Sequence, residues 1–210
     1  MEILGRCELH NADCMEVMKT FKDKQFSLAI CDPPYGININ VNMGRRKGDK
    51  KSDYHKFEGG DKSIPDKEYF DELFRISQNQ IIWGGNYMTE YLPPSPCWIL
   101  WDKMFSEEVT FAQYEMAWTS FKTSAKKFTK HPSQQERIHP TQKPIQLYKW
   151  LLQNYAKEGD TILDTHFGSL SIGIACHDLG FDLTAIELDK DYYEMAKKRL
   201  INHQKQLQLF

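Results

Sequence analysis

The stretch SLAICDPPY occupies residues 27–35 and joins a short apolar run to an abrupt turn. Its first five residues are uncharged and do not alternate with polar ones, which predicts a strand buried on both faces, as in a parallel sheet covered by helices. Asp32 and the two prolines after it end the strand. Three further apolar runs stop in the same way at turn-forming or acidic residues, and we predict strands for them over 80–83, 98–101 and 161–163.

Helix-like stretches alternate with these strands along the chain. Helices are predicted over 14–21, 66–77, 145–154, 171–179 and 192–204, with a further short strand over 183–186. Strands and helices that alternate with short connections indicate an α/β fold with a doubly wound, mostly parallel sheet. In such sheets ligands bind at the carboxyl ends of the strands, where Asp32, Gly84 and Asp164 lie.

Length and composition are those of one domain. The 210 residues are 40% hydrophobic, which suits one sizeable core, and we predict a single domain over 1–210. Without a leader-like segment or an apolar run near the roughly 20 residues of a membrane span, we expect a soluble, cytoplasmic protein with no membrane partner. The five cysteines are odd in number and widely spaced, which predicts neither disulfides nor a metal site.

Basic residues are concentrated in two segments although the net charge is only −2. Residues 120–150 carry a net charge of +6 and residues 41–51 a net charge of +4, which leaves −12 for the rest of the chain. Two basic segments on an acidic body suggest a polyanion bound at one face, while charge alone is equally compatible with two solvated loops. The polar segment 41–63 is predicted to be a long mobile loop.

The tetrapeptide Asp32-Pro33-Pro34-Tyr35 is the most informative motif, because it follows a buried strand in the expected ligand crevice. An amino group on an aromatic base is a poor nucleophile, since its lone pair is delocalised into the ring. The Asp32 carboxylate and the Pro33 carbonyl can accept hydrogen bonds from its two N–H groups and localise that pair, while proline keeps the turn rigid. Tyr35 offers a ring on which a flipped-out base can stack. We therefore predict that these four residues form the catalytic segment.

A second motif, DTHFGSL over 164–170, runs from a predicted strand into the helix over 171–179. Backbone N–H groups of a glycine-containing turn at a helix N-terminus can bind a negative group, here the carboxylate of a cofactor. Glu187 ends another short strand about 20 residues further on, where an acidic side chain can hold ribose hydroxyls. Turn, helix and distant acid together predict a cofactor site.

The order and content of these motifs resemble the DNA amino-methyltransferases of the permuted beta class, in which the catalytic segment precedes the cofactor loop. The resemblance covers most of the chain and extends to NAD at 11–13, IWGGNY at 82–87, WILWDK at 98–103, HPTQKP at 139–144 and the segment 180–200. It implies the Rossmann-like fold of S-adenosylmethionine-dependent methyltransferases and transfer of a methyl group from S-adenosyl-L-methionine to the exocyclic N6 of adenine in double-stranded DNA.

The resemblance also implies a prokaryotic or phage protein of restriction-modification type, and a homodimer in which a small protomer can embrace more DNA. The cofactor contacts that it implies, together with those of the second motif, are Asp13, Cys14, Asp32, Thr141, Lys143, Asp164, His166, Phe167, Gly168, Ser169, Glu187 and Leu188.

Two features depart from the family pattern. The cofactor loop of the family has the form D-P-F-x-G-S-G, so His166 stands where an aromatic wall is expected and Leu170 where a glycine allows close backbone approach. Only about 35 residues separate Lys103 from His139, which leaves little room for a separate target-recognition domain. The basic loop 41–63 and a basic insertion over 120–138 are therefore expected to contact DNA, through Arg45, Arg46, Lys47, Lys122, Lys126, Lys127 and Lys130.

Three other functions fit the same motifs. A cytosine-N4 methyltransferase acts on the same kind of planar amino group, although that family tends to begin the catalytic motif with serine. A protein-glutamine methyltransferase would act on a chemically similar amide, but it usually has asparagine at the position of Asp32. A DNA-binding relative without activity is the third alternative, because the cofactor loop is altered.

Overall fold

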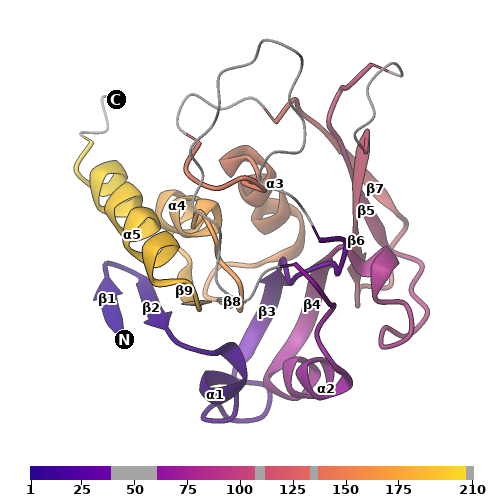
Figure 1. The fold of residues 1–210 in the computed structure, drawn as a ribbon, viewed down its shortest axis with the longest axis horizontal. Helices are drawn as coiled ribbons and strands as arrows, with labels where there is room; N and C mark the ends of the chain where they lie inside the picture. Colours follow the sequence, from indigo (N-terminus) through magenta and orange to yellow (C-terminus); the bar gives the residue numbers. More distant parts are fainter. Residues whose placement is uncertain (39–60, 107–111, 133–136, 207–210) are drawn as a thin grey trace.

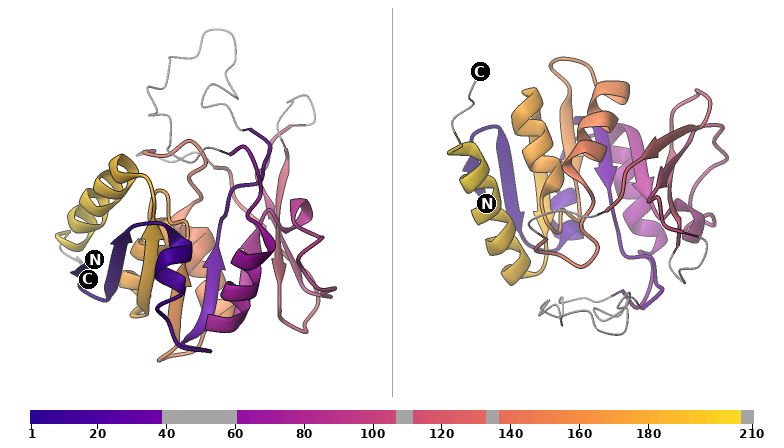
Figure 2. Two further views of the ribbon diagram at one scale, coloured as in Figure 1. Left: turned by 60° about the horizontal axis from the view of Figure 1, so that its bottom comes forward. Right: turned by 90° about the horizontal axis from the view of Figure 1, so that it is seen from above.

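The computed structural model describes residues 1–38, 61–106, 112–132 and 137–206. These residues form one sheet with helices on both of its faces (Figures 1 and 2). The strands found in them are β1 (Glu2–Leu4), β2 (Cys7–Asn11), β3 (Phe26–Cys31), β4 (Ser77–Trp83), β5 (Trp98–Asp102), β6 (Tyr114–Thr119), β7 (Lys126–Thr129), β8 (Thr161–Asp164) and β9 (Asp182–Glu187). The helices are α1 (Cys14–Met18), α2 (Lys67–Ile76), α3 (Ile145–Tyr155), α4 (Ser171–Leu179) and α5 (Lys190–Gln204), with a 3-10 turn η1 (Gly85–Tyr87).

The centre of the sheet is parallel. In the strand order β1-β2-β9-β8-β3-β4-β6-β5-β7, the five strands from β2 to β4 run in the same direction. Helices α3, α4 and α5 cover one face and α1 and α2 the other, each face with its own cluster of buried apolar side chains. The carboxyl ends of β3, β8 and β9 therefore meet at one edge. This arrangement confirms the predicted doubly wound α/β fold.

Aspartates fix the starts of three helices. Asp13, Asp66 and Asp189 precede α1, α2 and α5, and each accepts a hydrogen bond from a backbone N–H of the first turn. These caps place α1 and α5 next to the ends of β2 and β9. Helix α1 is shorter than the predicted 14–21, and α5 begins two residues before the predicted 192 because Asp189 caps it there.

The far side of the sheet differs from the sequence prediction. The apolar run 98–101 predicts another strand of a parallel core, but β5 pairs antiparallel with β6, and β6 lies between β5 and β4. Every second residue of β5 is only half-buried, so its run of large apolar residues does not mean full burial on both faces. Strands β1, β2, β6 and β7 carry no clear signal in the sequence, since they are short and mix polar with apolar residues.

The basic stretch 120–138 contributes one strand to the sheet. Its residues Lys126–Thr129 form β7, which pairs in parallel with β5 at the edge of the sheet. The register places Lys126 beside Ile99 and Thr129 beside Asp102. Residues 133–136 lie outside the described part of the chain.

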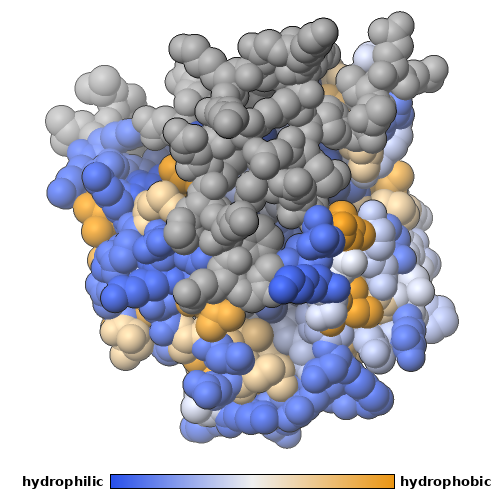
Figure 3. All heavy atoms as spheres, in the orientation of Figure 1, coloured by the Kyte–Doolittle hydropathy of each residue, from blue (hydrophilic) through white to orange (hydrophobic). Residues whose placement is uncertain are grey.

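Surface and interior agree with the composition. The face seen in Figure 3 is mostly hydrophilic where it is described, and its apolar residues are scattered. Across the described ranges, no helix is both long and apolar enough to cross a membrane. All five cysteines carry free thiols, and all but the half-buried Cys14 are buried like small apolar residues.

Candidate active site

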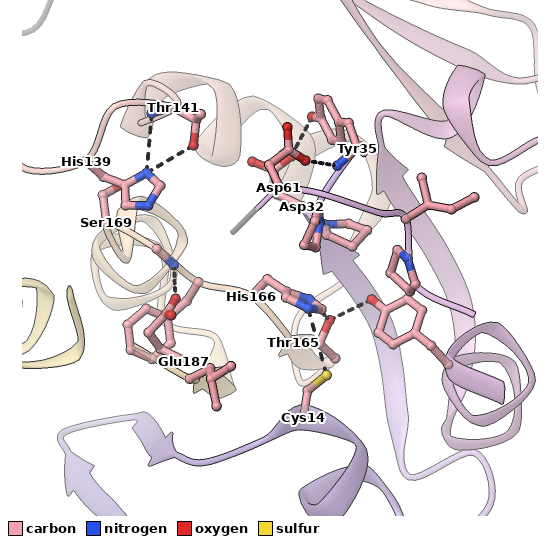
Figure 4. A pocket seen from close by; sticks show the side chains of 18 of the residues that line it. Cys14, Asp32, Tyr35, Asp61, His139, Thr141, Thr165, His166, Ser169 and Glu187 are labelled. Carbon is pink, nitrogen blue, oxygen red and sulfur yellow. Dashed lines mark hydrogen bonds between the residues drawn. The ribbon is translucent and has the colours of Figure 1, made fainter. Parts of the chain in front are cut away.

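A pocket of about 410 Å³ opens at the carboxyl ends of β3, β8 and β9 (Figure 4). Its walls come from segments that are far apart in the sequence, including 12–15, 32–35, 139–143, 165–169 and 187–188. The pocket therefore brings together the two motifs that the sequence predicts to be functional.

The catalytic segment forms a tight turn directly after β3. The Tyr35 hydroxyl donates a hydrogen bond to Oδ1 of Asp32 at 2.6 Å. The backbone N–H groups of Tyr35 and Gly36 both donate to Oδ1 of Asp61, at 2.6 and 2.9 Å. Because Asp61 is buried, its carboxylate holds this turn from within the protein (Figure 4).

The ring of Tyr35 lies against the turn that follows β4. Gly84 has a φ of +69°, and a Cβ on it would come within 2.2 Å of Cε1 of Tyr35, so both conformation and space require glycine here. Tyr87 stacks on Tyr35 with ring centroids 5.5 Å apart. The motif at 82–87 thus shapes the surroundings of Tyr35.

Asp32 also belongs to a cluster of alternating charges. Its Oδ2 lies 2.5 Å from Nζ of Lys143, and the same Nζ lies 3.1 Å from Oε2 of Glu115. Oε1 of Glu115 pairs with Lys103 at 2.5 Å. Burial by itself lowers the pKa of Lys143, but Asp32 and Glu115 outweigh it and raise that pKa above its usual value. Burial raises the pKa of Glu115, and the two lysines more than offset this and lower it.

The turn after β8 meets the end of β9 on the other side of the pocket. Oε2 of Glu187 accepts a hydrogen bond from the backbone N–H of Gly168 at 2.9 Å, and Oε1 accepts one from the N–H of Asp189 at 2.9 Å. Burial raises the pKa of Glu187, against the effect of these hydrogen bonds. The N–H of Gly168, which the sequence predicts to bind a cofactor carboxylate, thus binds a carboxylate of the protein.

His166 lines the pocket as a neutral ring. Its Nδ1 lies 2.9 Å from Oγ1 of Thr165, which is in turn hydrogen-bonded to the hydroxyl of Tyr69 at 2.7 Å. Its Nε2 lies 3.8 Å from Sγ of Cys14. Burial lowers the pKa of His166 to about 4. A neutral imidazole in contact through both nitrogens supplies a flat wall where the family pattern has another aromatic residue.

Leu170 replaces the glycine of the family pattern without entering the pocket. It has φ 55° and ψ 33°, the left-handed conformation, at the residue that precedes α4. Its side chain is fully buried and packs on Gly173, where a Cβ would come within 2.7 Å of Cγ of Leu170. The backbone keeps a turn suited to glycine at a cost of about 1–2 kcal/mol, and the side chain enters the core.

The HPTQKP motif contributes His139 as well as the predicted Thr141 and Lys143. Oγ1 of Thr141 lies 3.0 Å from Nδ1 of His139, whose ring packs edge-on against Tyr192 with centroids 4.3 Å apart. Burial is the main cause that lowers the pKa of His139 to about 4, and the positive charge of Lys143 is the second cause. This neutral ring also faces Gly168, so the motif closes one side of the cofactor turn.

The pocket contains nearly every residue that the sequence predicts for the site. The predicted residues that line it are Asp13, Cys14, Asp32, Pro33, Pro34, Tyr35, Thr141, Lys143, His166, Phe167, Gly168, Ser169, Glu187 and Leu188. Asp164 does not line it. This residue is buried behind the wall, where its Oδ1 accepts a hydrogen bond from the N–H of His166 at 3.0 Å. Burial raises the pKa of Asp164 to about 8.

Sequence reasoning misses several residues of the pocket, among them Asp61, Tyr69, Glu115, His139 and Thr165. His139 and Thr165 belong to motifs that the sequence shows, so their neighbours could have pointed to them. Asp61 and Glu115 stand in no motif, and only the fold brings them to the pocket.

The predicted DNA contacts that the structure describes fall into two groups, one near the pocket and one away from it. Lys127 reaches Asp102 near the pocket, with Nζ and Oδ2 3.3 Å apart, and the N–H of Lys130 donates to the backbone carbonyl of Asp102. Lys126 lies toward the other end of β7 and contacts Asn154 at the end of α3, and Lys122 precedes it. The predicted contacts Arg45, Arg46 and Lys47 lie outside the described residues, as do residues 41–60 of the predicted loop.

Sheet order and pocket define an α/β protein of the S-adenosylmethionine-dependent methyltransferase type. A family model described as DNA methylase, of the N6/N4 class, matches residues 82–198, which is more than half of the chain. The chain belongs to this DNA methylase family. The DNA amino-methyltransferase family predicted from the sequence motifs is thereby confirmed, and its permuted beta class stays a prediction.

Curated relatives are Type II methyltransferases. M.HinfI of Haemophilus influenzae is 26% identical over 243 residues, which cover 90% of this chain and 66% of the relative. M2.MboI of Moraxella bovis is 23% identical, with 91% of this chain and 86% of the relative covered. M.HpaI of Haemophilus parainfluenzae is 42% identical over 62 residues, which are 30% of this chain and 20% of the relative. The chain thus matches less than two thirds of the length of M.HpaI and just under two thirds of M.HinfI.

Solved structures share the fold. M1.HpyAVI in complex with S-adenosylmethionine has a TM-score of 0.59 at 20% identity, over 92% of this chain and 99% of that one. The Thermus thermophilus protein TTHA0409 has a TM-score of 0.62 at 16% identity, over 95% and 97%. The cytosine-N4-specific PvuII DNA methyltransferase has a TM-score of 0.63 at 10% identity, over 94% and 90%.

Proposed function

We propose that the protein is a DNA methyltransferase that transfers a methyl group from S-adenosyl-L-methionine to the exocyclic N6 of adenine. The observation that carries the proposal is the shared pocket that joins Asp32 and Tyr35 to the turn of Gly168. Two substrates must meet in one space for a direct transfer. The names of the Type II relatives and the S-adenosylmethionine complex of M1.HpyAVI support methyl transfer from S-adenosyl-L-methionine.

The cofactor half of the pocket fits S-adenosyl-L-methionine, which supplies a methyl group on a positively charged sulfur. Glu187 and Asp13 offer carboxylates to hydroxyl and amino groups, and His166 offers a neutral flat wall. Leu188 lines the pocket with an apolar side chain that is 47% exposed, which suits a surface that a ligand covers. Polar groups at the ends and apolar walls between them match the chemistry of a nucleoside with an amino-acid tail.

The catalytic half prepares acceptors for the target amino group. Asp32 is held between the hydroxyl of Tyr35 and the ammonium of Lys143, so its carboxylate needs little reorganisation before transfer. Together with the carbonyl of Pro33 it accepts hydrogen bonds from the two N–H groups. Burial, with the charge of Asp32, holds the pKa of Tyr35 well above its usual value, so the tyrosine stays a neutral donor and its ring can receive the base.

The identity of the methylated base, adenine or cytosine, is the part of the proposal that this experiment tests. Asp32 at the head of the motif favours adenine through the family resemblance, while the PvuII enzyme shows that a cytosine-N4 methyltransferase shares this fold. DNA incubated with protein and S-adenosyl-L-methionine is digested to nucleosides and analysed by mass spectrometry, with Asp32→Ala as the control. We expect N6-methyladenine. N4-methylcytosine would reassign the substrate, and no methylated base together with no cofactor binding by calorimetry would indicate an inactive relative.

We further propose that basic residues hold the phosphates of double-stranded DNA. Replacing Arg45, Arg46 and Lys47 together by Ala should flatten the dependence of log affinity on log salt by up to about three units, one for each phosphate that is no longer neutralised. The pair Lys122→Ala and Lys126→Ala, toward the end of β7 away from the pocket, serves for comparison and should change the slope less. An unaltered slope in the triple variant would remove that segment from the DNA face.

The homodimer stays a prediction, which sedimentation equilibrium can test.

A further inference from the structure

Glu115 lines the pocket with a carboxylate and belongs to none of the sequence motifs. It lies on β6 opposite Trp101 of β5, and its side chain is 22% exposed. Its two oxygens pair with two different lysines, Oε1 with Lys103 at 2.5 Å and Oε2 with Lys143 at 3.1 Å. Lys103 does not line the pocket, whereas Lys143 does. Glu115 therefore lies between a lysine outside the pocket and a lysine that lines it with Glu115.

Lys143 connects Glu115 to the catalytic carboxylate. Its side chain is 2% exposed, and its Nζ lies 2.5 Å from Oδ2 of Asp32 and 5.1 Å from the centre of the Trp83 ring. A buried ammonium this close to a single carboxylate would draw electron density from it and weaken it as a hydrogen-bond acceptor. Because Lys143 has a second carboxylate partner, part of its attraction is directed away from Asp32.

The balance of charge matters most during transfer. The amino nitrogen would gain a positive charge as its bond to the methyl carbon forms and the bond between that carbon and the sulfonium sulfur breaks, which leaves a neutral thioether. The nitrogen would lose this charge when an N–H proton leaves to solvent. Asp32 and Lys143 form a neutral pair beside this nitrogen, and Glu115 with Lys103 forms a second neutral pair behind it. Lys143 is therefore shared between two carboxylates, and Asp32 remains the negative group nearest the nitrogen. A fixed negative charge in a site that excludes water stabilises a developing positive charge.

We propose that Glu115 is a positioning residue for methyl transfer: it binds the ammonium of Lys143 and so leaves the carboxylate of Asp32 able to stabilise the positively charged amino nitrogen. For the reaction itself this inference rests on the proposed function. The link between Glu115 and Lys143 rests on the ion pair alone. If Lys143 instead served the cofactor, as the sequence predicts, loss of the Glu115 charge would alter cofactor affinity rather than the transfer rate.

The first test is Glu115→Gln, which keeps the size of the side chain and removes its charge. The methylation rate in a single turnover, at saturating cofactor and DNA, should fall about 10- to 100-fold, less than the roughly 100- to 1,000-fold for a group that contacts the reacting atoms. The dissociation constant for S-adenosyl-L-methionine should change less than about threefold. Glu115→Asp keeps the charge and should recover most of the rate.

Glu72→Gln on α2 is the matched control. Glu72 pairs with Arg75 at 2.8 Å and its side chain is 20% exposed, close to the 22% of Glu115, but it lies outside the pocket. This variant should methylate at the wild-type rate. Equal rates for Glu115→Gln and wild type would overturn the proposal, and so would a loss of cofactor affinity as large as the loss of rate.

A second test needs neither DNA nor activity. The charged and titratable groups that face Glu115 come from three elements and are Lys103 after β5, Lys143 before α3, Tyr148 on α3, and Asp32 and Tyr35 after β3. In Lys143→Met the titration of the Glu115 carboxyl, followed by carbon-13 NMR, should move to higher pH, because a cation that holds its pKa down is gone. The titration of Glu72 should not move.

The two tests separate this inference from the proposed function. If wild type methylates DNA and Glu115→Gln is equally fast, the function stands and the inference fails. If wild type does not methylate DNA but the Glu115 titration moves, the proposed function fails while the link to Lys143 stands. An unmoved Glu115 titration in Lys143→Met would overturn the inference whatever the activity.

Discussion

The catalytic half of the pocket, around Asp32, and the cofactor half, around Gly168, depend on different kinds of interaction. In the catalytic half, side-chain charges from distant parts of the chain meet in one row, with Asp32, Lys143 and Glu115 in contact. The cofactor half uses a backbone N–H of Gly168 and a ring that burial keeps neutral, that of His166. We infer that the rate of transfer depends on where charges are placed, and that cofactor binding and stability depend on the turns after β8 and β9.

The largest effect is expected for Asp32→Ala, which removes a carboxylate from the catalytic half. The methylation rate should fall at least about 100-fold, the scale of losing one preorganised group at the reacting atoms. The melting temperature should change little, because Lys143 keeps its ion pair with Glu115. Single-turnover assays and thermal melts measure the two effects. A well-folded Asp32→Ala protein with wild-type activity would disprove the catalytic role of the segment.

Glu187→Ala should act on affinity instead of rate. We expect binding of S-adenosyl-L-methionine to weaken by about 1–3 kcal/mol, or roughly 5- to 150-fold, because the ribose hydroxyls that Glu187 is proposed to hold lose their acceptor. Titration calorimetry measures the change, and the rate at saturating cofactor should stay close to wild type. Glu158→Ala, at an exposed residue outside the pocket, is the control. Unchanged affinity in Glu187→Ala would show that the cofactor lies elsewhere.

Leu170→Gly tests whether the altered cofactor loop affects stability alone. Glycine relieves about 1–2 kcal/mol of left-handed strain, but removing a fully buried leucine side chain costs more, about 2–5 kcal/mol. The free energy of unfolding should therefore fall by about 1–3 kcal/mol in urea titrations. Cofactor affinity should stay within about threefold of wild type, since Leu170 does not line the pocket. A large change in that affinity would place Leu170 in the cofactor site after all.

The smallest effect is expected for Asp164→Asn. Burial raises the pKa of Asp164 from 3.8 to about 8, so between these values the folded protein holds a proton that the unfolded chain has lost. This contribution makes stability fall as pH rises from about 4 to 8. Asparagine removes it and can still accept the hydrogen bond from the N–H of His166, so at pH 8 the variant should be more stable than the wild type.

Urea titrations of both proteins at pH 5 and pH 8 measure this pH dependence. The gain from Asp164→Asn should shrink toward pH 5, where the wild-type carboxyl is already protonated in the folded state. A gain of equal size at both pH values would mean that Asp164 is ionised in the folded protein.

Local sequence patterns predict most of the strands and helices at the centre of the fold. The apolar run 27–31 corresponds to β3 at Phe26–Cys31, and the predicted helix 171–179 is α4 at Ser171–Leu179. These elements are buried within the sheet and its helical layers, so their patterns are continuous and strong. The outer strands β6 and β7 mix exposed and buried residues, and their pairing depends on partners far along the chain.

By itself, the sequence determined the buried strands β3 and β8 and the Asp-Pro-Pro and glycine-containing segments at their ends, because proline turns, glycine turns and buried strands are local features. Only the tertiary structure decided that Lys143 pairs with Asp32, 111 residues away, and that Glu115 joins them. A local pattern holds no information about which buried lysine meets which carboxylate. That choice follows from the insertion of β6 between β4 and β5, which carries Glu115 to the pocket and completes a row of charges that no segment contains on its own.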